Sequence, residues 1–140
     1  MTRILGQNEA WAILEAGKLG RLGCIDNTEP YVVPINYLVD DGQIYVHSLP
    51  GRKIQAMREN HRACLQADQI RDDLHWSSAI AFGDFEEIID ESTRKQVMRL
   101  LRERFPQLTP VESLATLDAE LQPVIVFRLR VDRVTGVAEE

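Results

Sequence analysis

Cysteine, histidine and long apolar runs are scarce in this chain. It has two cysteines, three histidines and no apolar run near the about 20 residues of a membrane-spanning helix. Cys24 and Cys64 stand in apolar, strand-like stretches without the spacing of a zinc or redox motif, so we interpret them as buried free thiols. The histidines lack close metal-ligand spacing, and the N-terminus lacks the apolar centre of a signal peptide. We therefore expect a cytoplasmic protein that binds neither a metal ion nor a membrane.

The charge balance argues against a nucleic-acid partner. Sixteen basic and 22 acidic residues give a formal net charge of -6. No basic stripe with interleaved aromatic residues is present, although nucleic-acid binding usually needs one. A hydrophobic content of 44% over 140 residues is ordinary for a globular protein, and there is no repeat or low-complexity tract. We predict one domain that comprises residues 1–140.

Hydrophobic periodicity predicts six strands with helices inserted between them. The strands are expected at 21–26, 31–39, 43–48, 62–68, 77–89 and 124–131, the last continuing with a bend toward Val137. The helices are expected from a cap at Asn8 to near Gly17, at 52–59, at 91–105 and over a short stretch at 111–117. This pattern is typical of a mainly β domain of the α+β class.

Turn residues indicate how the strands connect. Asp40-Asp41-Gly42 is a strong hairpin signal, so the first three strands are expected to form an antiparallel meander. Gly83 allows a bulge in the long fifth strand. The polar segment 69–76 is expected to be irregular. Together these features predict a small antiparallel barrel.

The most informative segment runs from Tyr45 to Lys53. A strand-like run ends in His47-Ser48, passes through Pro50-Gly51 and restarts as a helix that begins with Arg52-Lys53. This order gathers a hydroxyl, two cations and the free amides of a helix start in one small volume, which suits a phosphate group. The alternative is a solvated helix start with two surface cations.

Five short motifs follow one another in the order seen in a known family. They are Gly20-Arg21-Leu22-Gly23, Pro30-Tyr31-Val32-Val33-Pro34-Ile35, His47-Ser48, Gly51-Arg52-Lys53 and Trp76-Ser77-Ser78. Together they resemble the pyridoxamine-phosphate-oxidase-like flavin-binding split barrels, and more narrowly the branch that includes nitroimidazole-resistance proteins. The resemblance extends from about Asn8 to Ile89. It implies a six-stranded split β-barrel, a homodimer, and FMN in a groove at the subunit interface.

The resemblance places the phosphate of FMN at the helix start. Arg52 and Lys53 would neutralise the phosphate, with Arg52 able to form paired hydrogen bonds. Ser48 would add a hydroxyl donor, and Gly51 would let the backbone approach closely.

The same resemblance assigns cofactor contacts to Trp76, Ser77 and Ser78. In the family a serine at this place reaches the cofactor phosphate. Ser78 fits the usual pattern better, and Ser77 is the alternative. Ser77 also stands where the family frequently has a cation. Trp76 would cover the flavin ring, or it would simply fill a dimer core.

The strand over 31–37 is expected to lie beside the flavin ring. Pro34 cannot donate to a sheet ladder, so the backbone groups of Val33, Ile35 and Asn36 would be free to bond the ring edge. The Asn36 side chain would add a polar contact. The alternative is an ordinary edge strand in which Pro34 protects against aggregation.

His47 is the one histidine within the matched motifs. An ordinary imidazole pKa near ~6.5 suits proton delivery after hydride transfer, so His47 is a candidate catalytic residue as well as a cofactor contact. The alternative is a strand-end histidine satisfied by the backbone.

These features lead us to expect an FMN-dependent oxidoreductase that reduces a small, flat, electron-poor molecule. The specific substrate class that the resemblance suggests is a nitroaromatic compound such as a nitroimidazole. NAD(P)H or another reductant would bind transiently, because the chain has no dinucleotide fingerprint. Pyridoxamine phosphate oxidation is less favoured, because the C-terminal segment does not match the oxidase's substrate-binding motif. The alternatives are a non-enzymatic module that binds flavin, or haem through His47, and a dimeric scaffold with an empty pocket.

Overall fold

Strands with one face toward a core make up most of the computed structural model, which describes residues 1–106 and 124–140. The described strands are β1 (Thr2–Ile4), β2 (Leu19–Asp26), β3 (Glu29–Asn36), β4 (Leu38–Asp40), β5 (Gln43–Ser48), β6 (Arg62–Asp72), β7 (His75–Glu87) and β8 (Ile125–Glu139). The described helices are α1 (Gln7–Ala16), α2 (Arg52–Glu59) and α3 (Glu91–Arg104). The predicted antiparallel β architecture with helices is therefore confirmed.

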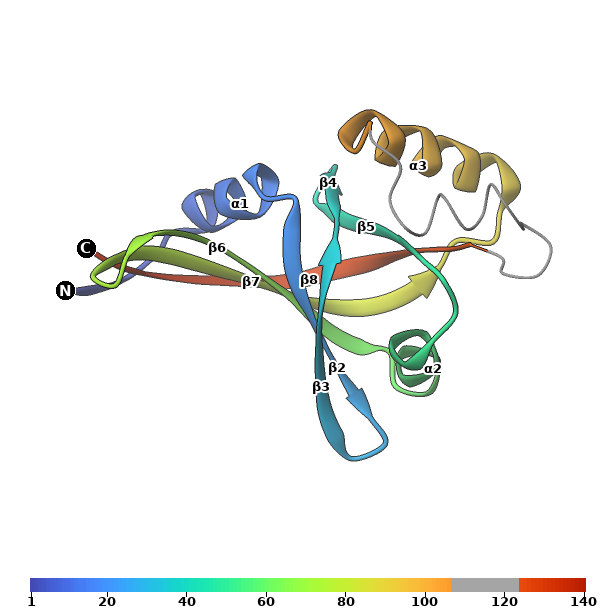
Figure 1. Ribbon diagram of the computed structural model, residues 1–140, viewed down its shortest axis with the longest axis horizontal. Helices are drawn as coiled ribbons and strands as arrows, with labels where there is room; N and C mark the ends of the chain where they lie inside the picture. The colour runs from blue at the N-terminus through green and yellow to red at the C-terminus, as the bar shows by residue number, and fades with distance from the viewer. Residues whose placement is uncertain (107–123) are drawn as a thin grey trace.

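All eight described strands belong to one open antiparallel sheet (Figure 1). Its hydrogen-bonded order is β3-β2-β6-β7-β8-β5-β4, and β1 pairs with β8 outside this path. The described strands thus form an open sheet, where a six-stranded barrel was predicted. The strand number exceeds six because β1 was not anticipated and the run predicted over 31–39 is divided. β3 and β4 follow one another in the chain, yet they stand at opposite ends of the strand order.

Tyr37 divides the predicted second strand. Its side chain is fully buried, its hydroxyl donates to the carbonyl of Leu14 at 2.6 Å, and its backbone N–H donates to the carbonyl of Lys18 at 3.0 Å. Burial also raises the pKa of Tyr37 to about 12. Both antiparallel pairings of the predicted meander are present, because β3 pairs with β2 and β4 pairs with β5. The prediction of one continuous middle strand is wrong, so the two hairpins do not form a single meander.

Two local predictions also needed correction, and a third is not tested. Gly6, not Asn8, precedes α1, and the Glu9 carboxylate accepts a hydrogen bond from the Gly6 amide at 3.1 Å. The segment 69–76 is not irregular, because β6 and β7 extend through most of it to a tight turn at Asp73-Leu74. The short helix predicted over 111–117 lies outside the described residues.

Two apolar clusters hold the helices on the sheet. The main core lies between the sheet, α1 and α2, and it includes the predicted inward residues Ile54 and Met57. The second cluster joins α3 to the sheet through Val97, Leu101 and Val126. Each buried aliphatic side chain of this kind stabilises the fold by roughly 1.5–3 kcal/mol. α2 is thus anchored by its apolar face, and its first residues remain available for other contacts.

Gly83 marks the predicted bulge, because the β7–β8 register shifts between Phe82 and Gly83. A Cβ atom at Gly83 would overlap the backbone carbonyl of Arg130. We expect Gly83→Ala to lower the free energy of unfolding by about 3 kcal/mol, since backbone must move to admit the methyl group. Denaturant unfolding followed by circular dichroism measures this loss. Gly51→Ser is the matched control: its Cβ meets open space and serine is a favoured helix cap, so unchanged stability is expected there. Equal stability of Gly83→Ala and the parent protein would contradict the prediction.

Candidate functional site

The last two residues of β5, His47 and Ser48, lie on opposite faces of the strand. Ser48 is 3% exposed, and its hydroxyl donates to the carbonyl of Leu49 at 2.8 Å, inside the turn. His47 is 7% exposed and pairs in register with Val126, a member of the second apolar cluster. Because neighbouring strand residues alternate in direction, His47 faces the α3 side of the sheet and Ser48 faces the main core.

The start of α2 presents free backbone donors. No side chain caps this helix, although the first amides of any helix lack intrahelical acceptors. A Cβ atom on Gly51 would meet nothing within 4 Å, so the residue that precedes the helix borders open space. The amides carry the positive end of the helix dipole. An anion of modest size therefore fits here on steric and electrostatic grounds.

Arg52 is held by the β2–β3 turn. Its Nε donates to Oδ2 of Asp26 at 2.6 Å, and its Nη2 lies 3.5 Å from Oε1 of Glu29. Its guanidinium also covers the ring of Tyr31, 4.3 Å from the centroid. The hydrogen bond that Arg52 donates to Asp26 is the main reason that the pKa of Arg52 is raised. Arg52 thus reaches across from α2 to the beginning of β3.

Lys53 has a different environment. It is half-buried, and no carboxylate of residues 1–106 or 124–140 forms an ion pair with it. Burial lowers the pKa of Lys53, and the nearby Cys24 opposes this shift slightly. A partly desolvated ammonium group without a counter-ion favours binding of an anion. Of the two cations, Lys53 is the less exposed, but its charge is not offset by an ion pair within the described residues.

The predicted ring-side residues lie on β3, which pairs with β2 and is an edge strand of the described sheet. Ile35 is buried and Val33 packs against the main core, whereas Pro34 and Asn36 point away from it. The Asn36 side chain lies 3.4 Å from the carbonyl of Lys18. The edge position fits both interpretations of Pro34 that the sequence allows.

An apolar groove of about 310 Å³ opens beside Tyr31, the residue beneath Arg52. Its lining includes Pro30, Val32, Cys64 and Phe82. Phe82 and Cys64 are register partners, and Gly23 lies between Cys64 and Val32 in the same cross-strand row. The sulfur of Cys64 lies over Gly23, 2.9 Å from the place that a Cβ atom on this glycine would take. A flat apolar group suits such a groove.

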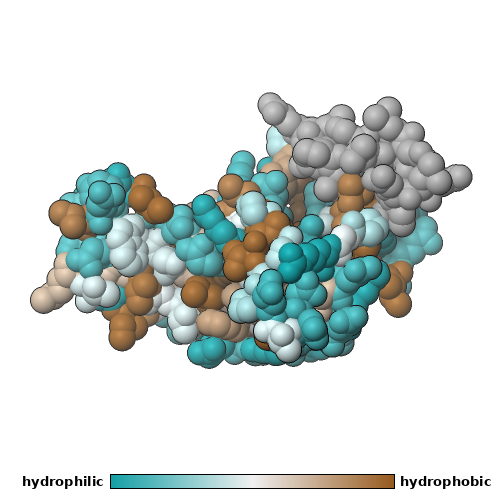
Figure 2. All heavy atoms as spheres, turned by 60° about the horizontal axis from the view of Figure 1, so that its bottom comes forward, coloured by the Kyte–Doolittle hydropathy of each residue, from teal (hydrophilic) through white to brown (hydrophobic). Residues whose placement is uncertain are grey.

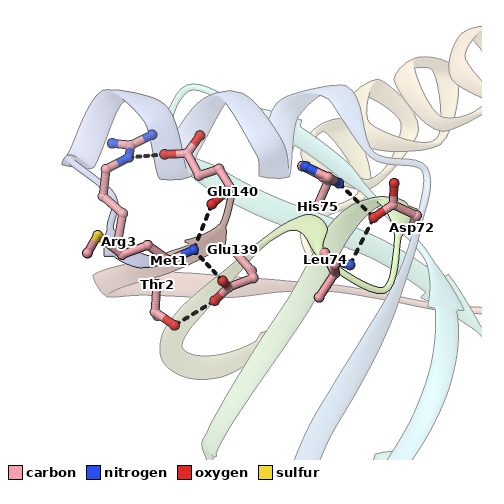
Figure 3. A network of polar contacts seen from close by, with 8 residues as sticks. All are labelled: Met1, Thr2, Arg3, Asp72, Leu74, His75, Glu139 and Glu140. Atoms are coloured by element: carbon pink, nitrogen blue, oxygen red, sulfur yellow. Dashed lines mark hydrogen bonds and ion pairs between the residues drawn. The ribbon is translucent and has the colours of Figure 1, made fainter.

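Trp76 and Ser77 line a larger cavity of about 670 Å³ at the β6–β7 hairpin, next to the chain termini. Ser78 instead accepts a hydrogen bond from Nε2 of Gln66 at 2.9 Å. Nearby, Nδ1 of His75 lies 2.7 Å from Oδ1 of Asp72. Figure 3 shows this pair on one side and the cluster of both chain ends on the other.

Ion pairs connect the residues of that terminal cluster. The Met1 amine contacts Glu139, and Arg3 contacts both Glu140 and Glu9. These acids therefore have cationic partners already, and they fix β1 against the end of β8. The cavity beside Trp76 is lined by charged residues of this cluster and by apolar residues that include Leu5 and Ile13.

The two groups of predicted cofactor residues do not meet within one chain. Cys24, Ala63 and Gly83 lie in one cross-strand row. Asp26, the partner of Arg52, is two residues beyond this row, and Ser78 is five residues away in the other direction. At about 3.3 Å per residue, the two positions are about 23 Å apart along the strands. In Figure 1, the β6–β7 hairpin accordingly lies at the left end of the molecule, well apart from α2, which lies below and to the right of the middle.

The sequence did not predict the residues that hydrogen-bond to the predicted site residues Arg52 and Ser78. Asp26 and Glu29 bind Arg52, and Gln66 binds Ser78. Two acidic residues that flank the turn at 27–28 were visible in the sequence, but their link to Arg52 depends on tertiary structure. Gln66 had no local signal at all.

The described residues contain neither a metal-ligand cluster nor a membrane-spanning helix. No group of three or more histidine, cysteine or acidic side chains there is placed to hold a metal ion. No helix in the same part of the chain is long and apolar enough to cross a membrane.

Comparison with known families gives a match over nearly the whole chain. A family model described as Pyridoxamine 5'-phosphate oxidase matches residues 6–138. An uncharacterized protein of Rhizobium meliloti (strain 1021) is 34% identical over 86 residues. That alignment covers 61% of this chain and 57% of the relative, so the chain spans little more than half of the relative's length.

Solved structures share the fold. A FAD-binding protein from Mesorhizobium loti is 28% identical with a TM-score of 0.78, and the alignment covers 100% of this chain and 99% of that one. A candidate 5-nitroimidazole antibiotic resistance protein from Bacteroides thetaiotaomicron is 22% identical with a TM-score of 0.75, with coverages of 100% and 92%. A FAD-binding protein from Mycobacterium smegmatis is 22% identical with a TM-score of 0.70, with coverages of 96% and 97%. The last two, at their low identity, show the fold alone.

Proposed function

We infer that this chain, which belongs to the pyridoxamine 5'-phosphate oxidase family, is an FMN-dependent oxidoreductase that reduces a small, flat, electron-poor molecule. The observation that carries the proposal is the uncapped start of α2, where Lys53 has no carboxylate partner among the described residues and the space at Gly51 is open. Such a start suits the phosphate ester of a flavin mononucleotide. The flavin-binding neighbour at 28% identity supports the same cofactor class.

The described residues fit the separate parts of FMN. Lys53, the α2 amides and Arg52 would hold the phosphate, and Gly51 would let it approach the backbone. The apolar groove beside Tyr31 has the lining that a flat ring needs. When bound, FMN supplies the hydride or electrons, and the protein supplies position, electrostatics and exclusion of water. His47 remains our candidate for proton delivery, with the buried strand position described above.

We also propose that two copies of the chain complete the site. Register places Val32, Ile70, Trp76, Ser78 and Val137 on the same face of the sheet, opposite the main core. Val32 is 65% and Ile70 is 70% exposed. Figure 2 shows hydrophobic side chains at the surface both in the middle of the molecule and at the end that carries the termini. Docking a second copy on this face would bury these groups and bring Trp76 to Ser78 of one copy toward α2 of the other.

The substrate proposal is a nitroaromatic compound, such as a nitroimidazole, with NAD(P)H or another reductant as the electron source. The motif order that resembles the nitroimidazole-resistance branch is what suggests this class, and a candidate 5-nitroimidazole resistance protein shares the fold. An electron-poor flat ring would stack on the free face of the flavin, where the surrounding apolar side chains exclude water.

One experiment tests the cofactor and the reaction in sequence. The purified protein is denatured, and any released chromophore is identified by mass. The protein is then loaded with FMN and mixed with NADH or NADPH, and nitroimidazole reduction is followed by absorbance. We expect bound or bindable FMN and flavin-dependent substrate loss. Flavin binding without turnover of any nitroaromatic would indicate a flavin-binding module, a haem band would indicate the haem alternative, and failure to bind FMN would reject the proposal.

A further inference from the structure

We propose that Asp26 and Glu29 are built-in competitors for the flavin phosphate, so that Arg52 is shared between the β2–β3 turn and the cofactor. This inference rests on the proposed FMN site at the start of α2. It adds two residues that lower phosphate affinity, and it assigns to the β2–β3 turn a role in making the flavin exchangeable.

The geometry supplies the first argument. Arg52 donates its Nε to Asp26 at 2.6 Å, a short charge-assisted hydrogen bond, and its Nη2 lies 3.5 Å from Glu29. The Nε–Nη2 edge is one of the two edges through which a guanidinium can give a phosphate a paired contact. Arg52 therefore cannot give its full set of hydrogen bonds to a phosphate while the turn retains it.

The local charge supplies the second argument. Arg52 and Lys53 contribute two positive charges, and Asp26 and Glu29 contribute two negative charges, so the four groups cancel. The carboxylate of Glu29 is largely exposed, and that of Asp26 is partly covered. A phosphate monoester that carries nearly two negative charges near pH 7 is repelled by both acids while it is attracted by both bases. Removal of the acids thus makes the potential at the α2 start more positive.

The arrangement also explains why the exchange is feasible. Arg52 is 51% exposed, and exposed ion pairs are individually weak. A phosphate can therefore replace the carboxylates without unfolding the turn. The stack of the guanidinium on Tyr31 does not use any of the N–H donors, so Arg52 can keep this contact while it changes its acceptor.

The test compares three ligands that differ in charge at one position. At the end of the ribityl chain, riboflavin carries no charge, the methyl ester of FMN carries one negative charge and FMN carries nearly two. Their dissociation constants are measured by flavin fluorescence with the full-length parent, Asp26→Asn, Glu29→Gln and the double variant. We expect the double variant to bind FMN about three- to ten-fold more tightly, the methyl ester to gain less, and riboflavin to change less than about two-fold.

Glu87→Gln is the matched control. Glu87 accepts from Nε of Arg58 at 2.6 Å, so this variant removes an ion pair of equal length from the other end of the same helix. It is expected to leave all three affinities unchanged. Thermal unfolding of each variant checks the fold, and the single Glu29→Gln change, at the more exposed and more distant acid, remains informative if the double variant is unstable.

The sign of the change decides between the possible roles. Weaker FMN binding in Asp26→Asn would mean that the acid positions Arg52 for the phosphate, and unchanged FMN binding would mean that Arg52 only fastens the turn. Either result overturns the inference while the FMN site stands. If the parent binds no FMN, the proposed function itself has failed.

Discussion

Replacement of Arg52 and Lys53 together by alanine is expected to weaken FMN binding by at least about 100-fold. Each cation would form charge-assisted hydrogen bonds with the phosphate, and contacts of this kind contribute roughly 1.5–3 kcal/mol each. Both side chains extend from the first turn of α2, whereas the helix is anchored by Ile54 and Met57. The fold should therefore remain intact. Titration of the apoprotein with FMN, followed by flavin fluorescence, measures the loss.

Riboflavin and a second arginine provide the controls for this prediction. Riboflavin lacks the phosphate, so its affinity should change by less than about two-fold in the double variant. Arg58 lies in the same helix but pairs with Glu87, and Arg58→Ala should leave FMN binding unchanged. An unaltered FMN titration curve for the double variant would contradict the assignment of the phosphate to the start of α2.

Local signals predicted the parts of the fold that short segments determine. The hairpin at Asp41-Gly42 formed as expected, and both residues have a positive φ, at 49° and 70°. The helix predicted over 91–105 ends within one residue of its expected end, before Pro106. In both cases the residues that set the conformation are neighbours in the sequence, so no distant contact was needed to predict it.

The errors arose where a distant contact decides the outcome. Tyr37 looks like one more aromatic residue in a strand rich in Val, Ile and Tyr. Its hydroxyl reaches Leu14 in α1, 23 residues away, and that contact divides the strand. The segment 69–76 is polar because it lies at an exposed hairpin, and pairing between β6 and β7 nevertheless keeps it extended. Composition alone could not distinguish this hairpin from an irregular loop.

The candidate site divides in the same way. Gly51, Arg52 and Lys53 are consecutive, so a strand–turn–helix pattern places them together. Arg52 meets Asp26 across 26 residues, and no local pattern reports that contact. The predicted link between this cluster and Ser78 is a different case. Asp26, which binds Arg52, and Ser78 lie about 23 Å apart along the strands of a single chain. Only the pairing of two chains would bring them together.

Mixed dimers are therefore expected to recover one flavin site from two defective parents. One parent carries Arg52→Ala with Lys53→Ala. The other carries Ser78→Asp, or Ser77→Asp if Ser77 is the phosphate contact, and its added carboxylate would repel the phosphate. Each parent homodimer should bind FMN poorly. In a mixed dimer with sites shared between chains, one site has both defects and the other has none, so about one FMN should bind per dimer.

Co-expression with two affinity tags and tandem purification isolates the mixed species, and its FMN content is measured after denaturation. A chain that builds the site alone would retain one defect in every site, and the mixed dimer would then bind no better than its parents. A monomer in sedimentation at micromolar concentration would exclude the shared site before any mixing. One FMN per mixed dimer, with near-parental affinity, is the result that requires the phosphate cations and the serine to come from different chains, since no other distribution of the two defects leaves a complete site.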